Sequence, residues 1–173
     1  MLRQRSSKVV VLLLIALLIF FLDAGSKYYT SHFLPQLDSR HLWFPYGWIA
    51  VFQNLWGVDF SIVHATNRGI AWGLLSQYQL LLLCGRIVLI GGLIVYAFFI
   101  NRNRRWDLPL ALIITGASAN VLDYFLYGHV IDMFYFIFWG YHYPIFNVAD
   151  SAICIGSFWL VLVSKLGLRE NVA

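Results

Sequence analysis

The stretch VVVLLLIALLIFFL, residues 9–22, decides the class of fold. It contains only apolar side chains, but it is shorter than the roughly 20 residues that a helix needs to cross a bilayer. Continuing it through DAGSKYY, residues 23–29, gives the required length and places Asp23 and Lys27 in the last turns. Opposite charges four residues apart can pair on a helix. The stretch therefore predicts a membrane helix over about 9–29 that carries an ion pair near its end.

The composition of the whole chain supports this interpretation. Of the 173 residues, 61% are hydrophobic and 12% are charged, whereas soluble domains carry about 25% charged residues. The net charge of +4 does not indicate nucleic-acid binding, because the basic residues cluster at the ends of apolar segments. We expect a single integral membrane domain, residues 1–173, with three further spans. These cover about 80–100, which is interrupted only by Arg86, 108–127 and 145–166.

Residues 1–22 also resemble a secretory signal peptide, because basic residues precede an apolar core. No A-x-A-like cleavage site follows, and three more spans do, so we interpret the segment as an uncleaved first helix. Basic residues in loops mark the cytoplasmic side. They lie before the first span, between the second and third, and after the fourth: Arg3, Arg5, Lys8, Arg102, Arg104, Arg105, Lys165 and Arg169. Both termini are therefore predicted to be cytoplasmic.

Two segments fall on the outer side, about 30–78 and 128–144. In the first, GWIAVFQN (47–54) and VDFSIVHATN (58–67) are β-branched and aromatic with some alternation, which is typical of strands. The turn residues of FPYG and NLWG suggest hairpins. The predicted fold is thus an all-α membrane protein with four transmembrane helices. A small β-sheet in the first outer loop would lie on the membrane surface. The aromatic loop 128–144 would either cover a site or anchor the protein at the interface.

The few carboxylates gather at the outer ends of these spans. NVLDYFLYGHVIDM (120–133) carries Asp123 and Asp132, NVAD (147–150) carries Asp150, and Asp23 ends the first helix. Ionisable groups at membrane depth are costly and are usually functional. The cluster therefore predicts a functional site in the outer leaflet.

Spacing adds detail to this cluster. Asn120 and Asp123 are three residues apart, as are Asn147 and Asp150, so each amide shares a helix face with a carboxylate. Two carboxylates in a partly dry site share one proton, which gives a base to activate water and an acid for the leaving group. Spacing alone leaves open which two of Asp123, Asp132 and Asp150 form the pair. Gly128 is predicted to end the third helix.

Four stretches, taken in order, resemble lipoprotein signal peptidase, also called signal peptidase II. They are DAGSK (23–27), NRGIAWG (67–73), GASANVLDYFLYGHVID (116–132) and FNVADSAICIG (146–156). The resemblance implies that Asp132 and Asp150 are the catalytic pair. The supporting or substrate-binding positions are then Asp23, Lys27, Asn67, Gly69, Asn120, Asp123 and Asn147. Asn67 would bind substrate backbone or stabilise its loop, Asp123 and Asn120 would orient the pair, and Asp23 with Lys27 would do so too or form only a helix-end ion pair.

The same resemblance implies an aspartic endopeptidase of the bacterial cytoplasmic (inner) membrane, with its active site on the periplasmic side. Such an enzyme cleaves a prolipoprotein signal peptide before a diacylglyceryl-modified Cys. We expect no cofactor and no metal. Its partners would be the lipidated substrate and membrane lipid, without nucleic acid, and we expect a monomer.

Some positions depart from the family pattern. Tyr124 replaces the usual Arg after Asp123, and this change removes a charge partner of the acids. Arg86 would either compensate for that loss or extend outward to the membrane surface. Three further departures leave the pair untouched: Trp72, Ala119 and Met133.

Three other interpretations compete. A small transporter or proton-conducting protein would also need intramembrane acids, but the inner halves of the first, second and fourth spans are almost bare of polar residues. A metal site formed by His129, Asp132, His142 and Asp150 is possible, although no tight His or Cys spacing supports it. A scaffold without chemistry would tolerate replacement of either Asp132 or Asp150.

Overall fold

The computed structural model describes residues 2–37, 48–69 and 75–170, and within that part four long helices dominate. Each contains a stretch long and apolar enough to cross a membrane. The second continues into a π-helical turn, η3 (Tyr96–Ile100), and follows a short 3-10 turn, η2 (Ser76–Tyr78). The helices are α1 (Leu2–Phe33), α2 (Gln79–Val95), α3 (Asp107–Tyr127) and α4 (Val148–Glu170).

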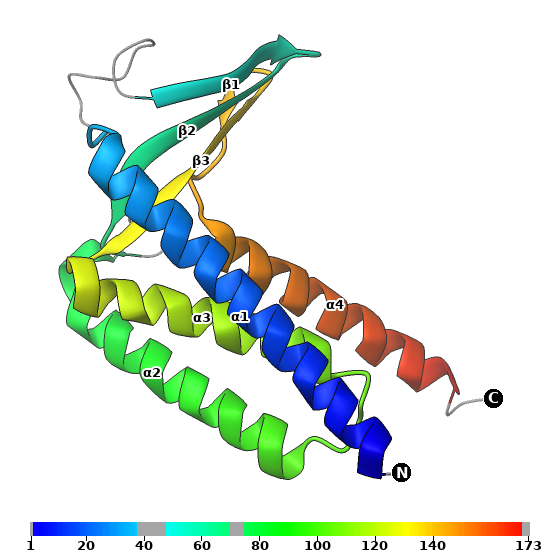
Figure 1. Ribbon diagram of the computed structural model, residues 1–173. Coiled ribbons are helices and arrows are strands. Elements are labelled where there is room, and N and C mark those ends of the chain that lie inside the picture. Colours follow the sequence, from blue (N-terminus) through cyan, green and yellow to red (C-terminus); the bar gives the residue numbers. More distant parts are fainter. Residues whose placement is uncertain (1, 38–47, 70–74, 171–173) are drawn as a thin grey trace.

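α3 is the centre of the bundle. It packs along α4 and also contacts α1 and α2 (Figure 1). Gly116 lets α3 approach α4 closely, because a Cβ atom there would lie 2.4 Å from the carbonyl oxygen of Ala149. Small residues commonly permit such contacts between membrane helices. Gly128, with a φ of 76°, ends α3 as the sequence predicted.

A four-stranded antiparallel sheet lies across one end of this bundle, while the start of α1 and the end of α4 lie at the other (Figure 1). The hairpin predicted around NLWG is confirmed, and its turn contains Gly57 with a φ of 83°. The strands follow sequence order: β1 (Trp48–Leu55), β2 (Val58–Asn67), β3 (Val130–Phe138) and β4 (Tyr141–His142). The turn proposed at residues 44–47 lies outside the described residues.

The assignment of 128–144 to a loop was wrong, because that segment supplies β3 and β4. The sequence VIDMFYFIF of β3 is almost continuously apolar and lacks the alternation that would mark a half-buried strand. Its main partner is β2, more than sixty residues earlier in the chain, and the ring of Phe136 stacks on that of Phe60 with 4.3 Å between centroids. The sheet therefore joins the two segments 30–78 and 128–144 instead of belonging only to the first.

Helix boundaries differ modestly from expectation. α1 extends beyond 9–29 at both ends, and α2 and α3 match closely. α4 begins at Val148, not at 145, because Phe146 is held by β3. Its backbone N–H donates to the Phe134 carbonyl (3.2 Å), and the Phe134 N–H donates back (2.8 Å).

Candidate active site

The backbone bridge between Phe134 and Phe146 brings two acids from different elements together. Asp132 lies two residues before Phe134 on β3, and Asp150 lies in the first turn of α4, four residues after Phe146. Because both flank one bridge, the sheet and the helix present their carboxylates to the same place. The pair is therefore assembled by the junction of sheet and bundle.

Asn147 links the two carboxylates. Its side-chain Nδ2 donates to Asp132 Oδ1 (2.8 Å), and its backbone N–H donates to Asp150 Oδ2 (3.3 Å). In return, the Asp150 N–H donates to Asn147 Oδ1 (2.8 Å). This reciprocal arrangement is a capping box, in which an N-cap residue and the residue three positions later satisfy each other's backbone. Residues at the Asn-x-x-Asp spacing thus cap the start of α4 and also hold the two carboxylates in place.

Asn120 approaches the pair from α3. Its Nδ2 donates to Asp150 Oδ1 (2.8 Å), and its Oδ1 accepts from Asn147 Nδ2 (3.2 Å). The close contact between Gly116 and Ala149 explains this position, since Asn120 is one turn beyond Gly116 and Asp150 follows Ala149. The spacing between Gly116 and Asn120 on α3 therefore sets the distance between the Asn120 amide and the Asp150 carboxylate.

The fourth element at the site is the end of β2. Asn67 pairs with Val130 in the sheet, which places it diagonally across from Asp132. Its Nδ2 donates to Asp132 Oδ2 (3.1 Å), while its Oδ1 accepts from the Gly69 N–H (2.9 Å). Both oxygens of Asp132 thus accept a hydrogen bond from an asparagine amide.

Lys27 lies at the centre of a second cluster behind the pair. Its side chain is fully buried, and its ammonium group contacts Asp23 Oδ2 (2.5 Å), Asp123 Oδ2 (2.6 Å) and Asn120 Oδ1 (3.0 Å). Asp23 also accepts a hydrogen bond from the Ala149 N–H (2.8 Å), at the N-terminus of α4. The predicted pairing of Asp23 with Lys27 is confirmed. This cluster fixes α1 to α3 and α4 beneath the carboxylate pair.

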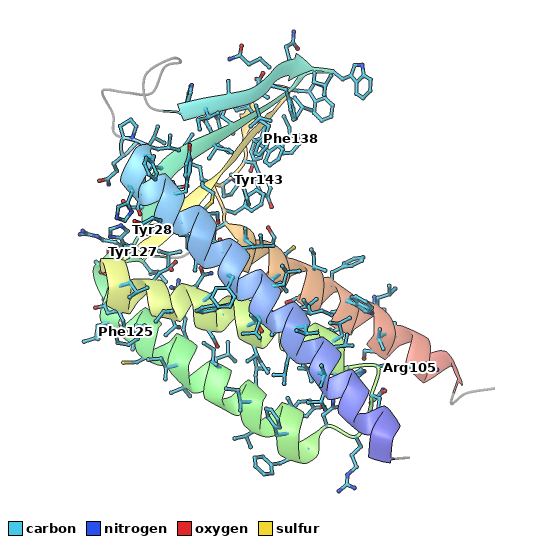
Figure 2. The ribbon with its side chains drawn as sticks, in the orientation of Figure 1. Tyr28, Arg105, Phe125, Tyr127, Phe138 and Tyr143 are labelled. Carbon is cyan, nitrogen blue, oxygen red and sulfur yellow. The ribbon has the colours of Figure 1, made fainter. Side chains whose placement is uncertain are left out.

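A cavity of about 700 Å³ opens beside the pair. Tyr143 lines it and packs edge-on against Phe138 and Phe146, in the region between the sheet and the start of α4 (Figure 2). The wall combines the polar groups already described with aromatic and aliphatic side chains: Asn67, Gly69, Arg86, Asn120, Val130, Asp132, Tyr141, Tyr143, Pro144, Ile145, Phe146, Asp150, Ser151, Cys154 and Ile155. Such a site suits a mainly apolar ligand with a few polar atoms.

Burial shapes the electrostatics of the pair. Asp132 is only 3% exposed. Burial first, and then the nearby charge of Asp150, raise the pKa of Asp132 from 3.8 to about 7, against the lowering effect of hydrogen bonds from Asn67 and Asn147. A proton is therefore retained on the pair near neutral pH, and the arrangement can both accept a proton from water and donate one.

Hydrogen bonds and ion pairs connect all nine predicted site residues into one network, but not all of them contact Asp132 or Asp150 directly. Asp123 contacts Lys27, not the pair, so it reaches the acids only indirectly. Arg86 neither pairs with an acid in the described part of the chain nor extends outward: its Nη2 donates to the Gly69 carbonyl (2.7 Å). Lys27 supplies positive charge near the acids instead. Trp72 lies outside the described residues.

The metal-site alternative receives no geometric support. His142 hydrogen bonds to the Tyr135 hydroxyl and stacks on its ring. Within residues 2–37, 48–69 and 75–170, no three His, Cys, Asp or Glu side chains are grouped so that they could hold a metal ion. The sequence suggested that the aromatic segment 128–144 either covers a site or anchors the protein, without singling out a residue; Tyr141 and Tyr143 of that segment line the cavity.

Four helices of membrane length, a sheet across one end of them, and two carboxylates that share one asparagine at the junction define a multi-pass membrane protein with a paired-carboxylate site. Residues 15–166 match the sequence model of the Signal peptidase (SPase) II family, and the chain belongs to that family.

Individual relatives agree with this assignment. A lipoprotein signal peptidase from Burkholderia ambifaria is 45% identical over 110 residues, covering 59% of this chain and 64% of that protein. One from Chlamydia trachomatis serovar L2 is 34% identical over 120 residues, covering 68% and 72%. A solved bacterial membrane enzyme superposes with a TM-score of 0.76 at 26% identity, covering 94% of this chain and 92% of that one. The aligned part thus spans a little under two thirds of the Burkholderia relative.

Proposed function

We propose that the protein is a membrane aspartic endopeptidase that cleaves prolipoproteins before a diacylglyceryl-modified Cys. The observation that carries this proposal is that Asp132 and Asp150 both accept a hydrogen bond from Asn147, at the wall of a largely apolar cavity. Membership of the signal peptidase II family supports the same reaction. The named relatives are lipoprotein signal peptidases, which fits a substrate with a lipidated residue.

The geometry supports the following mechanism. One carboxylate of the pair, ionised, takes a proton from a water molecule, and the other, protonated, polarises the scissile carbonyl and then protonates the leaving amine. The two acids titrate as a pair, so the roles belong to the pair. Asn67, Asn120 and Asn147 hold the carboxylates in place through the hydrogen bonds described above.

The depth of the site fits such a substrate. The pair lies where the sheet meets the helix ends, so an apolar signal helix lying along the bundle would present its end to the acids. We place the sheet and the site at the periplasmic face of the bacterial inner membrane, with both termini cytoplasmic. The basic residues near the start of α1, between η3 and α3, and near the end of α4 support this orientation. We propose that the enzyme acts as a monomer without a cofactor.

The test is a gel-shift cleavage assay in detergent, with a prolipoprotein substrate prepared with and without its diacylglyceryl group. We expect the wild type to cut only the lipidated form. Asp132→Asn and Asp150→Asn should each lose a factor of about 10³ or more in rate, as happens when one member of a catalytic unit is removed. Asp59→Asn is the matched control, because Asp59 is on β2 and accepts a hydrogen bond from the Asn54 N–H, at the turn of the hairpin and outside the cavity wall.

An inert wild type, or active Asp132 and Asp150 variants, would refute the proposal. Proton flux through liposomes that disappears in Asp132→Asn would instead favour a proton-conducting protein. Activity that chelators abolish would point to a metal.

A further inference from the structure

α2 carries one charged side chain in its membrane-length stretch, Arg86, at a depth where charges are costly and usually functional. The side chain is half-buried and lines the cavity. No carboxylate of the described residues forms an ion pair with it. Its Nη2 atom instead donates to the carbonyl oxygen of Gly69, at 2.7 Å. The charge on α2 is therefore used to hold a backbone group at the edge of the site.

Gly69 connects this contact to the pair. Its N–H donates to Asn67 Oδ1 (2.9 Å), so the oxygen end of that amide is turned toward Gly69 and the nitrogen end toward Asp132. An asparagine amide can be turned either way, and its neighbours decide which end faces an acid. If the Gly69 backbone were released, the Asn67 amide would no longer be held with its donor toward the carboxylate.

The chemistry of arginine suits this arrangement. Arg86 brings a guanidinium group to the cavity from α2, which packs against α3. A guanidinium has five N–H donors in a fixed planar group, which suits it to holding carbonyl oxygens.

We propose that Arg86 is a positioning residue for the peptidase reaction: it holds the Gly69 carbonyl and thereby fixes the Asn67 amide against Asp132. The inference rests on the proposed function. It assigns to α2 a part in the reaction that the pair and its asparagines do not supply.

The consequence is a measurable link between Arg86 and the ionisation of the pair. The hydrogen bond from Asn67 lowers the pKa of Asp132 relative to the value that burial alone would give. Loss of the Arg86 contact should weaken that bond and move the alkaline limb of the pH–rate profile to higher pH. A side chain that only packs in the bilayer would leave the profile unchanged.

The test measures kcat and KM against pH for Arg86→Met, Arg86→Lys, Asn67→Ala and the double variant Arg86→Met/Asn67→Ala, with the lipidated substrate. We expect Arg86→Met to lower kcat by about tenfold, the change that corresponds to loss of one hydrogen bond. KM should change little, the alkaline limb should move upward as in Asn67→Ala, and the double variant should be no slower than Asn67→Ala. Arg86→Lys retains a donor and should restore part of the rate.

The matched control is Gln79→Leu, because Gln79 is also on α2 and also donates to a backbone carbonyl, that of Gly128 (2.7 Å) at the end of α3, and neither residue lines the cavity. It should keep the wild-type pH profile. Fully additive effects of Arg86→Met and Asn67→Ala, or an Arg86→Met profile identical to that of the control, would overturn the inference. Activity of the wild type and inactivity of Asp132→Asn test the proposed function separately, so failure of one is distinguishable from failure of the other.

Discussion

Lys27 offers the sharpest test of how the site is held together. Its ammonium group has three N–H donors, and all three have partners: the carboxylates of Asp23 and Asp123 and the amide oxygen of Asn120. The two acids are 1% and 4% exposed. Replacing Lys27 by Met keeps an unbranched apolar side chain, one atom shorter, but removes the cation that both buried carboxylates contact.

Removing one partner of a buried ion pair costs about 3–5 kcal/mol, because the remaining charge is left uncompensated. For a chain of this size, 1 kcal/mol shifts the midpoint of thermal unfolding by about 2–4 °C. We therefore expect Lys27→Met to unfold roughly 10 °C below the wild type in detergent. Lys165→Met, which removes an exposed charge from α4, is the control and should unfold with the wild type.

A second variant separates lost charge compensation from lost packing. In the Lys27→Met background, Asp123→Asn removes one of the unpaired buried charges and should recover several degrees of the midpoint. If Lys27→Met unfolded with the Lys165→Met control, or if Asp123→Asn lowered the midpoint further, the assignment of Lys27 as the compensating cation would be refuted.

Two other predictions follow from burial and close packing. Because the pKa of Asp132 is raised to about 7, the pair loses its last proton as pH rises through that region. The value of kcat/KM should therefore fall on the alkaline side with an apparent pKa near 7, and a rate that stays constant from pH 6 to pH 9 would contradict this. Gly116→Ala would place a Cβ atom against the Ala149 carbonyl oxygen, so α3 and α4 must separate at a cost of about 1–3 kcal/mol. Thermal unfolding should show this loss while Gly91→Ala, where a Cβ meets nothing within 4 Å, does not; equal midpoints for the two would contradict it.

The sequence predicted the four helices and the first hairpin because their signals are local. Apolar runs of membrane length and the turn around Gly57 depend only on neighbouring residues. β3 was missed because its pairing with β2 is not local and its apolar run has no alternation to identify it. The tertiary contact, not the strand's own pattern, decides its conformation.

The candidate site was also predicted only where its signals are local in the sequence. Spacing grouped Asn147 with Asp150, and the structure shows why, since the two form a capping box. Spacing alone could not choose Asp132 over Asp123, because the choice depends on the bridge between β3 and the start of α4. The contact of Arg86 with Gly69 was also beyond reach, since it joins two segments through a backbone carbonyl that no sequence pattern marks.

Three asparagines surround the pair, and each is oriented by a different donor. The Oδ1 atom of Asn147 accepts from the Asp150 N–H, that of Asn120 from Lys27, and that of Asn67 from the Gly69 N–H. With its oxygen held, each amide can present only its nitrogen to a carboxylate. All donors at the pair then favour the ionised form, while burial favours the protonated one. The opposition of these two effects leaves the pKa of Asp132 raised to about 7, and the proposed hydrolysis requires one acid of the pair to keep its proton near that pH.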